Sequence, residues 1–444
     1  MVSRRGFVQV LVSGAALAAV ARPAVGQTKD RPEAVLSPKG TLFLTGLQGF
    51  MQPGVDLKTY PMNKSSVLTR LNLETKVLEK IWLPVAQATA VGMAGTELLC
   101  SARNDGVATF LDTTKPQATV VGRVELPPGF VFTGGGVVAE DHGMAILCAS
   151  PQKVATPNDT GMIAVINLKT RGLEALVPSG GLRPHTVRRQ RKTDLVYISH
   201  EGAVDGGFNL NGIQMTHAGV APKIVRFDLK KRTVVGETPV VTTAEHLFNA
   251  AMGGFDVADD GTLVVTLHQG IPFIVNQKYY RRPDGQNPRT VDTLNQLRML
   301  LGDLDYALPI NALNEGDAML PLPVLVIRPN GTIDEVDVGR PFQRGFGTVF
   351  IKHDEKTALV VLDQSDAVIS IPLTGPINAK VLTHKIAGEL QLQDINFFVD
   401  VPGTPYVLAS CRYEGVALVN VRTLTTERRY TVDIFDGSGA VASV

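Results

Sequence analysis

The sequence predicts an all-β protein, a seven-bladed β-propeller with one helical insertion in its fifth blade. Two observations support this fold class. A short polar or glycine-rich turn followed by a β-rich apolar run occurs seven times, which is the pattern of a hairpin. A second series of turns closes the third strand of each unit, and uninterrupted units repeat every 48–50 residues. Four strands per unit at this period are typical of a propeller, whereas solenoids use shorter units.

The apolar runs after the first series of turns are the predicted second strands of the blades. They are residues 42–44, 98–100, 145–147, 195–197, 263–265, 359–361 and 406–408. In the second series an Asp or Asn such as Asn72 or Asp228 opens the turn, and its side chain can accept a hydrogen bond from a backbone amide two residues on. Seven such units fill residues 32 to about 434, so we expect one domain over 27–444.

Composition excludes several classes of protein. The chain has 444 residues, of which 44% are hydrophobic and 19% are charged, which suits a packed core and not a disordered chain. Its 43 basic and 42 acidic side chains give a formal net charge of +1, so we expect no nucleic-acid partner. Cys100, Cys148 and Cys411 each lie in an apolar run and are predicted to be buried small hydrophobic residues, with a redox pair or a thiolate ligand as the alternative.

The first 26 residues are predicted to be an export signal. Arg4 and Arg5 precede Phe7 and an apolar run over residues 10–20, and small residues lead up to Gly26. The paired arginines resemble a twin-arginine signal, which implies export in the folded state to the periplasm or the medium, often with a cofactor installed. A plain Sec signal or an unprocessed tail is the alternative. No later run reaches about 18 apolar residues, so we expect no transmembrane anchor after processing.

One segment resembles a known family of propellers. Residues 167–198 run through an apolar strand, an Asn-Leu-x-Thr turn, a Gly-x-x-Pro-His stretch and a second strand that continues to Ser199. This order is similar to the repeat of YVTN-type propellers, which include lactonase-like members. Val-Tyr-Ile-Ser at 196–199 stands where that family has its name-giving tetrapeptide. The resemblance implies the fold of the whole mature chain.

Three units carry insertions after their second strands, at residues 48–64, 201–222 and 274–322. In the longest, leucines at helical spacing predict a helix over 293–304. A connection of nearly 50 residues is too long to lack secondary structure of its own. It is interpreted either as a lid or partner surface, or as a loop that packs on the rim.

Polar side chains are predicted to gather on one face. In a propeller, second strands end on the face where first strands begin, which is called the top face here. His185 begins the first strand of blade four, and His200 and Glu201 end its second strand. His246 lies in the connection to blade five, and His268 ends the second strand of that blade.

Three hypotheses explain these residues. The first is a divalent or transition metal, because imidazoles beside a carboxylate bind such ions; the candidate ligands are His185, His200, His246 and His268. The second is a small anionic or polyhydroxylated ligand, with candidate contacts Arg103, His185, Arg344 and Arg412. In the third, these groups are structural and the face docks another envelope protein.

We therefore expect an exported protein that binds a small ligand or partner on its top face near blades four and five. The alternative is an enzyme, a metal-assisted oxidoreductase or lactonase-like hydrolase, in which His200 and Glu201 are the catalytic candidates. The sequence leaves open whether the protein is an enzyme. The glycines at 134–136 are interpreted as close-packed strand residues, and the basic run 188–192 as a solvated hairpin tip.

Overall fold

The structure is a computed structural model. It describes residues 39–46, 66–83, 88–115, 119–156, 158–202, 209–210, 213–214, 222–240, 251–268, 274–275, 278–279, 324–336, 348–362, 367–375, 377, 383–384, 395–411, 415–430 and 437–443. The chain divides into two compact units, Met1–Leu36 and Ser37–Val444. All described residues belong to the second unit.

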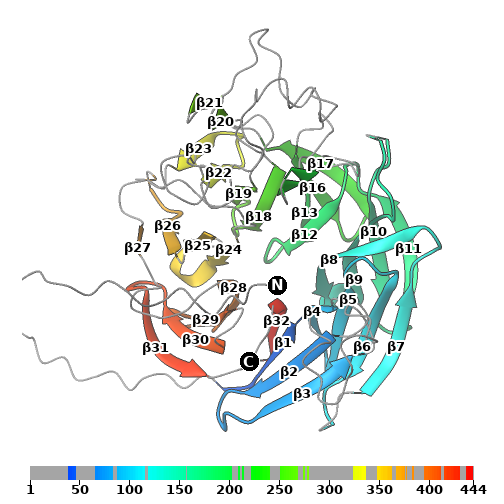
Figure 1. Cartoon of the computed structure of the whole chain (residues 1–444), viewed down its shortest axis with the longest axis horizontal. Coiled ribbons are helices and arrows are strands. Elements are labelled where there is room, and N and C mark those ends of the chain that lie inside the picture. The colour runs from blue at the N-terminus through cyan, green and yellow to red at the C-terminus, as the bar shows by residue number, and fades with distance from the viewer. Residues whose placement is uncertain are drawn as a thin grey trace, which may run out of the picture. The chain divides into compact units, whose positions relative to one another are not determined.

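Seven four-stranded antiparallel sheets confirm the predicted propeller (Figure 1). From the innermost strand outward, blade one contains β32 (Gly437–Ser443), β1 (Thr41–Gly46), β2 (Ser66–Asn72) and β3 (Leu78–Leu83). Blade two contains β4 (Ala88–Ala94), β5 (Glu97–Ala102), β6 (Val107–Asp112) and β7 (Thr119–Glu125). Blade three contains β8 (Phe130–Ala139), β9 (Met144–Pro151), β10 (Met162–Asn167) and β11 (Gly172–Pro178). Blade four contains β12 (Pro184–Arg189), β13 (Leu195–His200), β16 (Lys223–Asp228) and β17 (Thr233–Pro239).

The last three blades have the same order. Blade five contains β18 (Ala251–Val257), β19 (Leu263–His268), β22 (Val324–Ile327) and β23 (Ile333–Val336). Blade six contains β24 (Val349–Lys352), β25 (Thr357–Leu362), β26 (Ala367–Pro372) and β27 (Thr383–His384). Blade seven contains β28 (Ile395–Asp400), β29 (Tyr406–Cys411), β30 (Gly415–Asn420) and β31 (Thr425–Tyr430). All seven predicted second-strand runs lie in the second strands observed.

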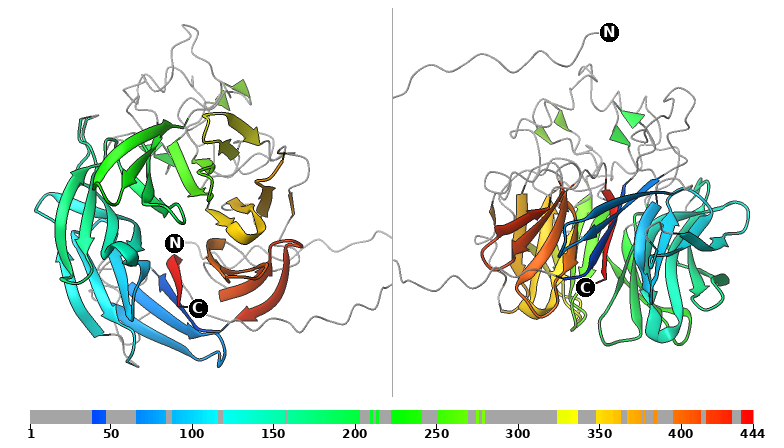
Figure 2. Two further views of the ribbon diagram at one scale, coloured as in Figure 1. Left: turned by 180° about the vertical axis from the view of Figure 1, so that it is seen from behind. Right: turned by 90° about the horizontal axis from the view of Figure 1, so that it is seen from below.

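The inner strands close a ring. Each one contacts the inner strand of the next blade, in the order β32, β4, β8, β12, β18, β24, β28 and back to β32 (Figure 2). The hydrophobic core lies between adjacent sheets, because its clusters combine residues of neighbouring blades, as Phe227 of blade four with Ile146 of blade three. Radial packing of this kind buries both faces of each sheet.

The C-terminus closes the ring, which the sequence did not reveal. The predicted units end near residue 434, but β32 follows and pairs antiparallel with β1, with Phe43 opposite Val441. Blade seven is complete without it. The first blade therefore takes its innermost strand from the end of the chain.

The second series of turns forms as predicted. Asn72 Oδ1 accepts hydrogen bonds from the backbone amides of Glu74 and Thr75 at 3.0 and 2.8 Å, and Asp228 Oδ1 does the same for Lys230 and Lys231. The fourth residue after this Asp or Asn has a positive φ in four blades. These residues are Lys76, Arg171, Arg232 and Leu424, with φ of 60°, 53°, 56° and 54°.

The glycines at 134–136 lie where neighbouring strands touch, as predicted. A Cβ atom on Gly135 would lie 1.7 Å from the carbonyl oxygen of His185, and one on Gly136 would lie 2.2 Å from Leu147. Only glycine allows the inner strands of blades three and four to approach this closely.

The basic run 188–192 is not a solvated tip, because its arginines join blade four to its neighbours. Arg189 forms a two-point ion pair with Asp141 of blade three, at 2.5 and 2.7 Å, and Arg191 Nε lies 3.3 Å from Asp259 of blade five. The hairpin tip thus connects three blades on the face opposite the top face.

Two short hairpins occur in the inserted segments. They are β14 (Asn209–Leu210) with β15 (Ile213–Gln214), and β20 (Ile274–Val275) with β21 (Lys278–Tyr279), and both lie above the top face in the right-hand view of Figure 2. The helix predicted over 293–304 lies outside the described residues. No helix in the described part of the chain is long and apolar enough to cross a membrane.

Candidate functional site

Strand register brings several predicted residues to one end of the sheets. Pro184 at the start of β12 pairs with His200 at the end of β13, and Ala251 at the start of β18 pairs with His268 at the end of β19. Glu201 directly follows β13. These residues therefore share the top face of blades four and five.

The rim of the top face is built from bulged inner strands. The register shifts in the first half of β4, β8, β12, β18 and β28, and near the start of β32. A bulge bends its strand and redirects a side chain. In blade four the bulge contains His185 and Thr186, and the Thr186 amide donates instead to Ser199 Oγ, at 2.8 Å.

Arg103 is held at this rim by the loop after β5. The Asn104 amide donates to the Phe132 carbonyl of blade three, and the Phe132 amide donates to the Asp105 carbonyl, both at 2.8 Å. A Cβ atom on Gly134 would lie 3.6 Å from Cβ and Cδ of Arg103. The exposed side chain of Arg103 thus packs over Gly134, and among the described residues no hydrogen bond or ion pair engages its guanidinium group.

His185 and Glu201 form a pair at the same end of the blades. His185 Nε2 lies 4.0 Å from Glu201 Oε1, and the two side chains are 26% and 16% exposed. His185 Nδ1 lies 3.3 Å from Thr186 Oγ1. Because Gly134 contacts Arg103 and Gly135 contacts the His185 backbone, two consecutive glycines bring the arginine and the histidine to the same rim.

His200 lies inside the protein. It is only 1% exposed, its Nε2 is 2.9 Å from Ser179 Oγ, and its ring covers Gly181, where a Cβ atom would lie 2.4 Å from Cδ2. Burial lowers the pKa of His200 to about 3, so its imidazole is neutral at physiological pH. The buried ring has no access to a molecule on the rim, which leaves His185 as the accessible histidine beside Glu201.

The remaining predicted site residues cannot be placed by side chain. Arg344, Arg412 and His246 lie outside the described residues, and only the backbone of His268 is described. In the part of the chain that is described, no group of three or more His, Cys, Asp or Glu side chains could hold a metal ion. His185 and Glu201 are described groups on this rim that can serve as metal ligands.

The sequence did not single out the residues that support the site. Thr133 Oγ1 donates to the Pro184 carbonyl across the boundary between blades three and four, and Ser179 and Ser199 hold His200 and the bulge. Single serine and threonine residues in or next to strands give no local signal for such contacts. Glycines are the sequence feature that marks the close approaches here, Gly181 two residues after Ser179 and the run 134–136.

The fold places the chain among seven-bladed β-propellers. No protein-family model and no curated protein matches the sequence. Among solved structures, a Pseudomonas aeruginosa periplasmic gluconolactonase is 10% identical with a TM-score of 0.51, covering 91% of this chain and 99% of that one. A Bacteroides uniformis protein classed as a 6-phosphogluconolactonase is 11% identical with a TM-score of 0.52, covering 91% and 99%. Hydrazine synthase of Kuenenia stuttgartiensis is 9% identical with a TM-score of 0.54, covering 80% and 89%. At such identities the likeness is one of fold.

Proposed function

We propose that the top-face rim of blades two to four binds a small polyhydroxylated carboxylate or the lactone from which it forms, in an exported protein. The observation that carries this proposal is the placement of Arg103 and the His185–Glu201 pair on either side of Gly134 and Gly135. A guanidinium fork suits a carboxylate, and a carboxylate–imidazole pair donates to and accepts from hydroxyl groups. Two structural neighbours are named for gluconolactone chemistry, which supports this ligand class.

Binding is tested by calorimetry with D-gluconate, using sorbitol as the uncharged probe of similar shape. We expect Arg103→Ala to weaken gluconate binding tenfold to a hundredfold, because a hydrogen bond to a charged group contributes about 1.5–3 kcal/mol. Arg123→Ala, in the exposed outer strand β7 of the same blade, is the matched control and keeps wild-type affinity. Equal affinity of wild type and Arg103→Ala would contradict the proposal. N-terminal sequencing of the exported protein checks the export prediction, with Gln27 expected first.

Hydrolysis of a lactone at this rim is the second candidate, favoured by the 4.0 Å separation of His185 and Glu201. His185 would take a proton from water as the water oxygen attacks the lactone carbonyl. The ring C–O bond then breaks, and the imidazolium returns the proton to the alkoxide. His185→Gln should lower kcat for glucono-δ-lactone by about 10²–10⁴-fold with little change in KM, and elemental analysis of the same preparation tests for a metal. A wild-type rate no faster than the spontaneous reaction excludes this candidate.

A further inference from the structure

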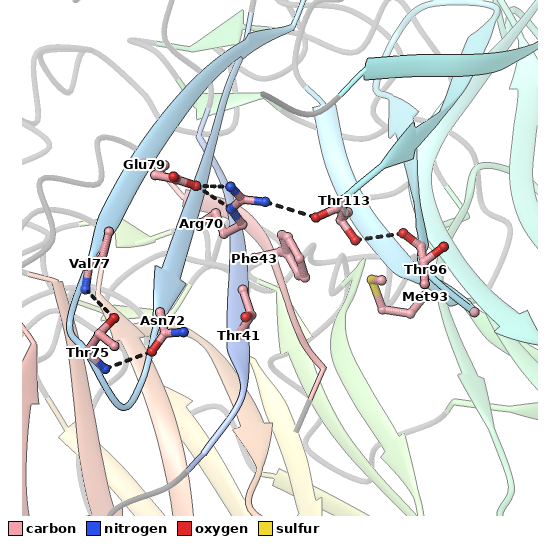
Figure 3. Close-up of a pocket in the computed structure, with 11 residues that line it drawn as sticks. Thr41, Phe43, Arg70, Asn72, Thr75, Val77, Glu79, Met93, Thr96 and Thr113 are labelled. Carbon is pink, nitrogen blue, oxygen red and sulfur yellow. Dashed lines mark hydrogen bonds and ion pairs between the residues drawn. The ribbon is translucent and has the colours of Figure 1, made fainter. Parts of the chain in front are cut away.

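A pocket of about 470 Å³ opens between blades one and two, at the opposite end of the strands from the top face (Figure 3). The turn after β2 and the turn before β5 form its walls, and Phe43 and Met93 contribute carbon surface. Thr41 and Thr96 also belong to its lining. Its size is that of a small-molecule site.

An apolar side chain fills the corresponding gap at other blade boundaries. In blade four the residue after Asp228 is Leu229, which is fully buried against blade three. In blade seven Val421 is buried against blade six in the same way. Blade two has Thr113 at this position, and the Thr113 hydroxyl donates to the Thr96 carbonyl at 2.7 Å. The boundary between blades one and two therefore lacks the buried apolar side chain that these other boundaries have at this position.

In blades three and four an arginine, three residues further on, also lies at the boundary with the preceding blade. Arg171 of blade three pairs with Glu97 of blade two, and Arg232 of blade four pairs with Glu174 of blade three, each at 2.5 Å. In blade two the sequence has Pro116 at this position. The boundary between blades one and two thus lacks both the apolar residue and the arginine that blades three and four have, and the pocket lies in the space that these side chains occupy there.

The charged groups of the pocket are already compensated. Arg70 forms an ion pair with Glu79, and its Nη1 donates to the carbonyls of Thr113 and Lys115 at 2.9 and 2.8 Å. An ionic ligand would gain no unpaired counter-charge here. Threonine hydroxyls beside an apolar surface instead match a molecule that is uncharged and carries both hydroxyl groups and C–H faces.

We propose that this pocket binds an uncharged polyhydroxylated molecule of the size of a mono- or disaccharide. The proposal is independent of the ligand on the top face, since the two sites share no residue and lie at opposite ends of the blades. Arg70 and Glu79 form a fixed wall of the pocket. Two adjacent hydroxyl groups of the ligand can accept a hydrogen bond from the guanidinium and donate one to the carboxylate. The absent leucine and arginine side chains define the space that the ligand occupies.

Calorimetry with D-glucose and maltose tests the proposal on the full-length mature protein. Thr113→Leu restores the apolar residue of the other blades, so we expect it to weaken saccharide binding at least tenfold while the thermal midpoint stays the same or rises. Thr96→Val removes one hydroxyl group without changing the shape, and should weaken binding at least threefold. Arg123→Ala is the control and keeps wild-type affinity.

Gluconate binding distinguishes this site from the top face, because Thr113→Leu should leave it unchanged. The proposal is wrong if the wild-type protein binds neither saccharide, or if Thr113→Leu and Thr96→Val both bind as tightly as wild type. Loss of saccharide binding in the two pocket variants, with gluconate affinity intact, supports it.

Discussion

His185 and His200 lie at the same end of neighbouring strands, but their surroundings differ. His200 packs on Gly181 and bonds to Ser179 within the protein, and its pKa is lowered to about 3 by burial. His185 lies in a bulge and remains 26% exposed beside Glu201. Since a buried charge is costly and a buried neutral imidazole is not, the two histidines have separate roles, one in packing and one at the rim.

The depressed pKa of His200 predicts a pH-dependent stability. An unfolded histidine has a pKa of about 6.5, so between that pH and about pH 3 the unfolded chain binds a proton that folded His200 does not. The contribution is fully present above pH 6.5, and the free energy of unfolding should fall by about 1.4 kcal/mol per pH unit below it. His200→Gln removes this slope. Denaturant unfolding of both proteins from pH 4.5 to 7.5 measures the difference, and parallel curves would contradict the prediction.

Sequence patterns located the rim residues by strand position but did not separate exposed from buried ones. The end of the strand at which a residue lies predicts its face of the propeller, because the repeat fixes the direction of each strand. The burial of His200 depends on contacts with Ser179 and Gly181, and His185 lies in a bulge against Gly135 of blade three. Neither arrangement is local in sequence.

At the scale of single elements, the turns that close the third strands were the most predictable part of the fold. Asn72, Asn167, Asp228 and Asn420 each fix a turn through their own side chains, so the information is local. The inner strands were less predictable, because Gly135 and Gly136 are required by contacts with a neighbouring strand and side chain. Local side-chain chemistry therefore determines the turns in the outer half of a blade, whereas packing between blades determines the inner strands.

The same turns predict a stabilising substitution. Lys76 is exposed and has φ of 60°, a conformation that costs a non-glycine residue about 1 kcal/mol. Lys76→Gly should raise the free energy of unfolding by about 0.5–1 kcal/mol in chemical denaturation. Lys76→Ala, which keeps the strain, is the control and should leave it nearly unchanged. A destabilised Lys76→Gly protein would show that the turn is not strained.

For the molecule as a whole, the repeat predicted seven blades but not the closure of the ring. Residues 437–443 read Gly-Ser-Gly-Ala-Val-Ala-Ser, a composition with little β-propensity. These residues form a strand because β1 offers an unpaired edge on one side and the inner strands β4 and β28 lie on either side of β32. Tertiary context therefore decides the structure of this segment, and the sequence alone does not report it.

Closure by β32 makes the last residues of the chain essential to the stability of the first blade. Deletion of residues 435–444 removes six paired positions on β1, and ladder hydrogen bonds contribute about 0.5–1.5 kcal/mol each. We expect the free energy of unfolding to fall by at least about 3 kcal/mol, measured by urea unfolding followed by circular dichroism. A synthetic peptide of residues 435–444 should restore part of the loss by adding a strand to the open edge, whereas a scrambled peptide should not. An unchanged unfolding midpoint in the truncated protein would mean that the ring holds without its C-terminal strand.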